Sequence, residues 1–313
     1  MQIQRILHPI DLQPGSRYSL PLAAELARKL DAELDVLHVE PLRGSVPLEV
    51  EEPAQLGTIR RETYFSGVRL RTTCRQAADV ASAIVDFAAD HDVDLVVMGS
   101  RNLHGNFFHL LRSDAREVAH RSPCSVLTLE AEQTPALIRL RTLLVPFDSS
   151  HLSREALRWA ATIAARWAAK VVVFHVIPES LWDAEDEGPG RARWRKTCHH
   201  QAELRLADVA SYLAPGVPVT LDIRFGDVTQ QILARAADGV DMVVMASHGG
   251  SAAKRLLLGS VADEVQRLAT VPVLLVKTDA APRRPVVHPA LVGDAVLELT
   301  SSPRAIDLGG NRP

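Results

Sequence analysis

The stretch Met245-Ala-Ser-His-Gly-Gly-Ser-Ala-Ala-Lys-Arg-Leu-Leu-Leu-Gly-Ser-Val261 decides how the rest of the chain is interpreted. It leaves an apolar run typical of a buried strand, crosses a loop of small residues and predicts a helix from Ser260. Gly249 and Gly259 allow other atoms to approach the backbone closely. Ser260 is predicted as the N-cap, with Asp263 as a partial capping box. Such a helix start favours an anion such as a phosphate.

Length and composition set the broad class of the protein. A chain of 313 residues most naturally forms two domains. The net charge of −3 points neither to nucleic acid nor to an anionic membrane. No apolar run is long enough to cross a bilayer, and the N-terminus resembles a strand rather than a signal peptide. Cys74, Cys124 and Cys198 are scattered and odd in number, which predicts thiols outside any disulfide and a cytoplasmic protein.

Strand and helix patterns alternate along the first part of the chain, which predicts an α/β fold with a parallel sheet covered on both faces. The expected strands are Arg5–Ile10, Glu33–Val39, Val68–Cys74, Asp94–Gly99 and Ser125–Leu129. The expected helices are Ser19–Leu30, Val80–Asp90 and Ser113–His120, with one short helix within 42–66.

The pattern then restarts. Thr142-Leu-Leu-Val-Pro-Phe-Asp148 repeats Arg5-Ile-Leu-His-Pro-Ile-Asp11, and Asp241-Met-Val-Val-Met-Ala246 repeats Asp94-Leu-Val-Val-Met-Gly99. Two more pairs follow the same order: Val172–Pro178 with Val36–Pro41, and Val271–Val276 with Ser122–Leu127. The second copy has a longer middle helix, about Arg191–Tyr212. A period of roughly 140 residues is far above that of solenoids and indicates a duplicated domain.

The repeat sets the expected boundaries. Residues 1–131 form the first domain, 132–141 a linker, 142–278 the second domain and 279–313 a flexible tail rich in proline.

With these motifs, the chain resembles a universal stress protein with two tandem domains, from about Gln4 to Lys277. The family's nucleotide loop is Gly-x2-Gly-x9-Gly-Ser/Thr, and the second half departs from it only by Ala246 in place of the first glycine. The resemblance implies two tandem flavodoxin-like (Rossmann-like) domains. Each would have a five-stranded parallel sheet of order 3-2-1-4-5, with helices on both faces. It also implies ATP beyond the carboxyl ends of strands one and four. No Walker loop is present, so backbone N–H groups and small side chains would hold the phosphates.

The resemblance also assigns roles in the second domain. Asp148 would lie near the adenine and ribose, and Val176 would offer backbone hydrogen bonds to the adenine edge. The remaining cofactor-binding positions are Pro146 and Phe147 beside Asp148, Met245, Ala246, His248 and Gly249 around ribose and phosphates, and Gly259, Ser260 and Val261 at the terminal phosphates. The glycine of the third-strand turn would be Gly226, followed by Asp227.

The first domain departs further from the family pattern. Asn102 replaces the second glycine and Arg112 the third, Asp114 follows Ser113, and Ala78 stands where the second copy has Gly226. Arg112 adds bulk where backbone should approach phosphate, and Asp114 opposes an anion. However, asparagine tolerates left-handed geometry, and Arg112 could donate to a phosphate. We expect a degenerate nucleotide loop in this half.

Plainer interpretations remain open for several residues. Gly249 and Gly259 could be turn glycines, and His248 a polar loop residue. His8, His38 and His175 are expected to be structural. Cys198, His199 and His200 are adjacent on a predicted helix and point in different directions, so no metal site is expected there.

These observations predict a cytoplasmic stress-response protein that binds an adenine nucleotide, ATP, in its second domain and acts as a nucleotide-dependent regulatory or interaction protein. Magnesium, where it accompanies ATP, would be held chiefly by the phosphates. One alternative is a slow ATPase or autophosphorylating enzyme. Beyond Asp148, His248 and Ser260 no convincing catalytic set is present, so no catalytic residue is assigned. The other alternative is a scaffold that binds no nucleotide.

The last strands of the two domains, Ser125–Leu129 and Val273–Lys277, are apolar edges that need covering. In tandem members of the family the domains pair through these strands, and we expect the same pairing within this chain. The sequence leaves open whether two chains also form a homodimer.

Overall fold

The chain folds as two similar α/β halves. This computed structural model describes residues 2–12, 14–42, 53–99, 109–130, 139–182, 189–207, 209, 213, 216–248 and 258–277. The first half contains β1 (Arg5–Ile10), η1 (Pro14–Ser19), α1 (Leu20–Leu30), β2 (Glu33–Pro41), α2 (Ala54–Ile59), η2 (Thr63–Phe65), β3 (Arg69–Ala77), α3 (Val80–Asp90), β4 (Leu95–Gly99), α4 (His109–Arg121) and β5 (Ser125–Leu129). The second half contains β6 (Thr142–Pro146), α5 (His151–Trp167), β7 (Lys170–Ile177), η4 (Glu179–Leu181), α6 (Pro189–Leu206), β8 (Val219–Phe225), α7 (Val228–Ala236), β9 (Met242–Ala246), α8 (Ser260–Leu268) and β10 (Val273–Val276).

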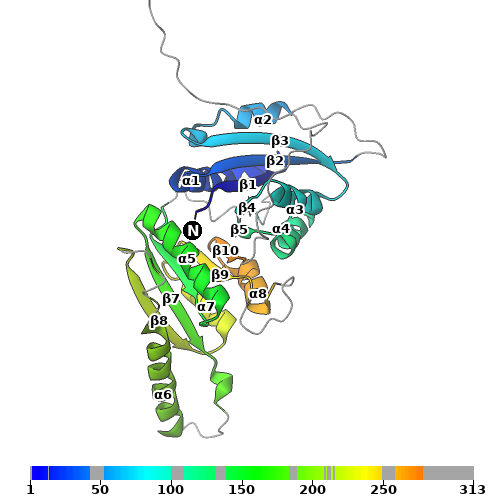
Figure 1. Cartoon of the computed structure of the whole chain (residues 1–313). Helices are drawn as coiled ribbons and strands as arrows, with labels where there is room; N and C mark the ends of the chain where they lie inside the picture. Colours follow the sequence, from blue (N-terminus) through cyan, green and yellow to red (C-terminus); the bar gives the residue numbers. More distant parts are fainter. Residues whose placement is uncertain are drawn as a thin grey trace, which may run out of the picture.

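The two halves share one ten-stranded sheet in the order β3-β2-β1-β4-β5-β10-β9-β6-β7-β8 (Figure 1). Within each half, strands run in the order 3-2-1-4-5, and every pairing is parallel. The expected fold class is therefore confirmed. The central strands are rich in valine and buried on both faces, as β4 and β9 illustrate, which suits parallel strands covered by helices on both sides.

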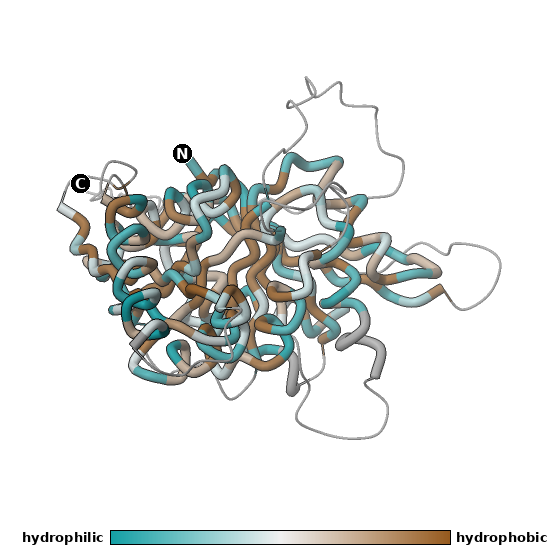
Figure 2. Tube along the Cα trace, turned by 90° about the horizontal axis from the view of Figure 1, so that it is seen from below, coloured by the Kyte–Doolittle hydropathy of each residue, from teal (hydrophilic) through white to brown (hydrophobic). Residues whose placement is uncertain are grey.

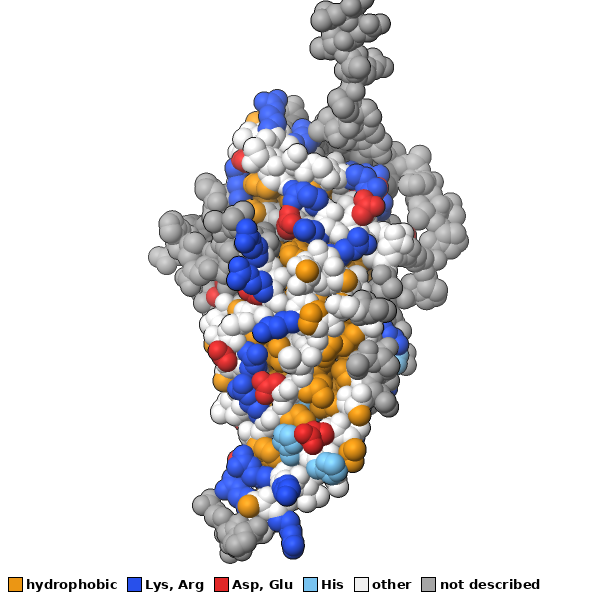
Figure 3. Space-filling view, turned by 90° about the vertical axis from the view of Figure 1, so that its left-hand side faces the viewer, with side chains coloured by type: hydrophobic (Ala, Val, Ile, Leu, Met, Phe, Trp, Pro, Cys, Tyr) orange, Lys and Arg blue, Asp and Glu red, His pale blue; other side chains and the backbone are white. Residues whose placement is uncertain are grey.

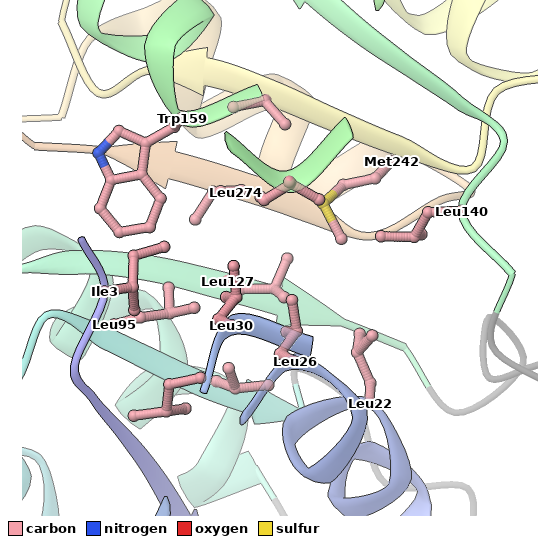
Figure 4. Close-up of a cluster of buried hydrophobic side chains, with 14 of the residues drawn as sticks. Ile3, Leu22, Leu26, Leu30, Leu95, Leu127, Leu140, Trp159, Met242 and Leu274 are labelled. Carbon is pink, nitrogen blue, oxygen red and sulfur yellow. The ribbon is translucent and has the colours of Figure 1, made fainter. Parts of the chain in front are cut away.

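Each face of the sheet carries one hydrophobic core that continues from one half into the other. On one face, α1 and α5 pack against the strands, and Leu26 and Trp159 belong to the same cluster. On the other face, α3, α4, α7 and α8 contribute Phe87, Val118, Ile232 and Val265, respectively, to a second cluster. Figure 2 shows the hydrophobic residues gathered along the interior of the molecule. In Figure 4, side chains of both halves meet in the first cluster, with Leu127 lying opposite Leu274.

The halves join through β5 and β10, the one antiparallel pair among the strands of the described residues. Thr128, Leu127 and Val126 lie opposite Val273, Leu274 and Leu275. The expected pairing through the last strands is confirmed.

Matching hydrogen bonds hold the start of each half. Asp94 Oδ2 accepts the amides of Gln4 and Arg5 at 2.7 and 3.0 Å. Asp241 Oδ2 accepts two amides at the start of β6, at 2.7 and 2.8 Å. An aspartate at the equivalent position thus fixes the first strand to the fourth in each half, in agreement with the repeat in the sequence.

The long helix of the second half is described as far as Leu206, and its expected end at Tyr212 lies outside the described residues. Three local predictions are wrong. The helix expected from Ser113 begins at His109. The N-cap of α8 is Gly259, not Ser260, and no side chain caps this helix. Asp263 closes no capping box because its carboxylate pairs with Arg116 of the other half. The flexible tail expected at 279–313 and most of the expected linker lie outside the described residues.

The sheet ends at two unlike edges. β3 carries Arg69, Arg71 and Arg75, whereas β8 exposes Leu221. Figure 3 shows hydrophobic side chains gathered in the lower half of the face toward which β8 and α6 lie. Within the described part of the chain, no helix is both long and apolar enough to span a bilayer.

The buried His8 leads to a prediction about acid stability. Its ring lies on β1, where the second half has Val145, and its Nε2 is 2.9 Å from Ser19 Oγ. Burial lowers the pKa of His8 to about 4 from 6.5. Between those pH values the unfolded state binds more protons than the folded state, so this part of the stability is lost as the pH falls. His8→Val should remove up to about 3 kcal/mol of the pH dependence of the unfolding free energy.

Urea denaturation between pH 7 and pH 4 measures this effect. The control is His151→Ala, which also removes a histidine but from a side chain that is 75% exposed. If His8→Val loses stability in parallel with the wild type and the control, His8 is not the group responsible.

Candidate functional site

The sheet of the second half opens where β6 and β9 end. These strands pair only at Leu143–Met242 and Leu144–Val243, after which they diverge toward their carboxyl ends. The chain leaves β6 for β7 on one side, while β9 pairs with β10 on the other. Open α/β sheets bind ligands at such a reversal of strand order. The sequence-predicted residues of β6, β7 and β9 all lie at this end of the sheet.

β7 extends beyond the end of β6 and offers main-chain groups there. The β6–β7 register ends at Pro146 and Phe174, and the carbonyl of Phe174 accepts the amide of Phe147 at 2.8 Å. Because strand residues alternate, the N–H and C=O of Val176 face the same side as those of Phe174, beyond the last residue of β6. Val176 can therefore present both a donor and an acceptor to a planar ligand.

The turn after β6 is held in place by the buried Phe147 and by His175. Phe147 is buried in the core, and its carbonyl lies 2.8 Å from Nδ1 of His175. In the first half, His38 Nδ1 lies 2.9 Å from the carbonyl of Ile10. His175 is thus structural, as expected, and Phe147 supports the turn rather than facing a ligand with its side chain. Asp148 follows on the exposed side of the turn, where its Oδ1 accepts the amide of Ser150 at 2.9 Å.

At the end of β9, buried and accessible residues alternate. Met245 packs into the core, whereas Ala246 is half-buried and pairs with Val276. Ser247, which sequence reasoning did not select, is buried and donates its amide to Val276 at 3.0 Å. Because its side chain is buried, Met245 could contact a ligand at the opening only through its main-chain atoms.

One hydrogen bond closes the loop between β9 and α8. The amide of Gly259 donates to the carbonyl of Ser247 at 2.8 Å, so residues far apart in sequence hold the start of α8 at the end of β9. The first intrahelical bond runs from the amide of Asp263 to the carbonyl of Gly259 at 2.9 Å. The amides of Ser260, Val261 and Ala262 precede that bond, so helix geometry leaves them outside the helical ladder. They form a potential anion-binding turn, with Ser260 exposed at its tip.

His248 lies between this loop and the junction of the halves. Its Nδ1 is 2.9 Å from Ser247 Oγ, and its Nε2 is buried without a hydrogen-bond partner among the described residues. Burial lowers the pKa of His248, and the nearby Lys277 and His120 lower it further. The neutral imidazole is therefore favoured. Gly249 lies outside the described residues.

The corresponding place in the first half is built differently. β1 and β4 also pair only at Ile6–Leu95 and Leu7–Val96 and then diverge. Here, however, the Tyr18 side chain packs so closely on Gly99 that a Cβ there would meet the phenol oxygen at 2.2 Å. In addition, α4 begins at His109, so Arg112 and Ser113 lie inside a helix rather than at its start. The helix start therefore does not coincide with Ser113 in the first half, and residues 100–108 of its loop lie outside the described residues.

Both halves do share the turn after the third strand. Asp227 caps α7 by accepting the amide of Gln230 at 2.9 Å, and Asp79 caps α3 by accepting that of Ser82 at 3.0 Å. Gly226 has a φ of +138°, a value that favours glycine, whereas the first half has Ala78 at this position. The two halves thus have the same helix cap, but the residue before the cap has a positive φ only in the second half.

Known proteins support the duplicated architecture. The family model described as "Universal stress protein family" matches residues 2–129 and again 139–277. The chain belongs to the universal stress protein family.

Its relatives span a similar length or one half. A universal stress protein of Mycolicibacterium smegmatis is 27% identical over 298 residues, covering 87% of this chain and 96% of the relative. Universal stress protein A homolog 1 of Coxiella burnetii is 30% identical over 144 residues, covering 41% of this chain and 97% of the relative.

Solved structures show the same fold. A universal stress protein from Archaeoglobus fulgidus has a TM-score of 0.59 at 20% identity, covering 88% of this chain and 97% of that one. A functionally unknown protein from Pseudomonas aeruginosa has a TM-score of 0.63 at 19% identity, covering 88% and 92%. At these identities the likeness extends to the fold alone.

The packing of Tyr18 on Gly99 can be tested in this universal stress protein by importing the alanine of the second half. Gly99→Ala places a Cβ 2.6 Å from the ring carbon Cζ of Tyr18 and should destabilise the fold by about 1–3 kcal/mol. In a Tyr18→Ala background the same change should cost about 1 kcal/mol less, because the clashing ring is gone. Urea denaturation of the four proteins of this cycle gives the coupling energy. Additive effects would show that Tyr18 does not occupy the space above Gly99.

Proposed function

We propose that this universal stress protein binds ATP in its second half and acts as a nucleotide-dependent regulatory or interaction protein. The observation that carries the proposal is the contrast between two equivalent openings. Beyond β6 and β9, the opening meets the N-terminal turn of α8, whereas in the first half Tyr18 packs on Gly99 at the end of β4. The glycines of the family's nucleotide loop belong to the half whose geometry suits an anion.

The proposed binding mode follows from the available groups. The main chain of Val176 would recognise the adenine edge, and the exposed Asp148 would accept hydrogen bonds from the ribose. The phosphates would lie against the amides of Ser260, Val261 and Ala262, at the positive end of the helix dipole. Magnesium would bind chiefly to the phosphates, since it retains most of its own waters.

A regulatory role is proposed from the link between β9 and α8. The Gly259–Ser247 hydrogen bond joins the end of β9 to the start of α8, so a nucleotide at α8 would act on both elements. A partner could then distinguish the bound from the unbound protein. We place this function in the cytoplasm because none of the three cysteines, all within the described residues, forms a disulfide.

The proposal predicts one ATP per chain and its loss on a single substitution. Gly259→Arg imports Arg112 of the first half and should weaken ATP binding at least about 100-fold, because side-chain bulk replaces the close backbone approach. Leu268→Arg is the matched control. It adds the same side chain at the other end of α8, where the first half has Arg121 and Leu268 is 44% exposed. This control should bind ATP like the wild type.

Isothermal titration of the intact chain measures both quantities. Two equal sites per chain would show that the first half also binds ATP, despite the packing of Tyr18 on Gly99. A wild type that binds no adenine nucleotide would instead favour the scaffold alternative.

A further inference from the structure

The first turn of α8 is bound to a helix of the other half. Arg116 of α4 donates from Nε and Nη2 to the two carboxylate oxygens of Asp263, at 2.9 and 2.8 Å. His120 Nε2 lies 3.5 Å from the same carboxylate. α4 and α8 lie next to each other on one side of the junction (Figure 1). A two-point contact of this kind fixes the orientation of the carboxylate and places a positive charge beside it.

Arg116 and Asp263 occupy equivalent positions of the repeat. Matching Ser113 with Ser260 places Arg116 where the second half has Asp263. Val126 and Leu275 are likewise equivalent in the repeat, and they lie directly opposite each other between β5 and β10. A local two-fold axis therefore relates the halves, and equivalent residues meet across it. Two aspartates here would repel each other, whereas this chain has a complementary pair.

The position of Asp263 matters for the proposed nucleotide site. It is the fourth residue of α8, in the same first turn as the amides that would receive phosphate. A carboxylate at this point repels a phosphate unless its charge is compensated. Its side chain is 27% exposed, so water screens the charge only in part. The compensating guanidinium comes from the half that does not bind the nucleotide.

Other cationic groups gather at the same junction. Lys277 Nζ donates to the carbonyls of His120 and Ser122 at 3.0 and 2.8 Å, at the C-terminal end of α4. Its ammonium is therefore committed to α4, while the Arg116 side chain reaches the Asp263 carboxylate. Among the described residues, Arg116 is the arginine that pairs with Asp263.

We propose that Arg116 of the first half is a positioning residue of the phosphate site in the second half. By neutralising and orienting Asp263, it makes the start of α8 suitable for a polyphosphate. This inference rests on the proposed function and adds to it a dependence of the site on the paired halves. Because linkage is reciprocal, a bound triphosphate would in turn stabilise the Arg116–Asp263 ion pair across the junction.

The test is a double-mutant cycle in the full chain, with ATP and adenosine as ligands in competition titrations. Arg116→Ala should weaken ATP binding about five-fold and leave adenosine binding unchanged, since only the phosphates meet the uncompensated carboxylate. In an Asp263→Asn background, Arg116→Ala should have no further effect on ATP. The control is Arg121→Ala, which removes the same charge from α4 but pairs with Glu117 and Asp79.

The outcomes separate the possibilities. An unchanged ATP affinity in Arg116→Ala would overturn the inference, and so would equal losses for ATP and adenosine, which indicate a purely structural role. An equal loss in the Asp263→Asn background would show that Arg116 does not act through Asp263. If the wild type binds neither ligand, the proposed function itself fails. Arg116 is 62% exposed, so its truncation should leave the fold intact, which circular dichroism checks.

Discussion

The pairing of β5 with β10 is the constraint on which the structure depends. Each half alone would expose the unpaired edge of an apolar, fully buried strand, which favours aggregation. Antiparallel pairing covers both edges at once and joins the two hydrophobic cores across the junction. It also brings α4 against α8, so that side chains of one half can serve the other. Because both halves are in one chain, they can diverge in sequence without losing their partner.

The two halves show this divergence at the same place in the fold. In both, the first and fourth strands separate after two paired residues. In the first half, the six-residue 3-10 helix η1 brings Tyr18 onto Gly99, whereas α5 of the second half begins directly after the turn at Asp148. The opening is thus a property of the topology, and the side chains decide whether it can receive a ligand. Membership of the universal stress protein family agrees with the fold, while the proposed ATP site follows from the loop of the second half.

Much of the fold could be predicted from the sequence, because hydrophobic periodicity and the internal repeat are local signals. The start of α8 at Ser260 and the limits of β5 are examples. The order of the strands was expected from the resemblance to the universal stress protein family. Side-chain contacts between distant residues could not be predicted in this way. Nothing near Tyr18 indicates that it packs on Gly99, and Asp263 resembled a capping residue because its partner, Arg116, lies in the other half. Ser247 was overlooked because only its hydrogen bonds with Gly259 and Val276 reveal its role.

The central claim is that one opening of the doubled sheet is built for a nucleotide and its twin is closed by side chains. A crystal structure of the intact chain grown with ATP tests it most directly. The account predicts electron density for one nucleotide, with its base beside Val176 and its phosphates at the start of α8, and Tyr18 still packed on Gly99. Density for a nucleotide beyond β1 and β4, with the start of α8 empty, would contradict it.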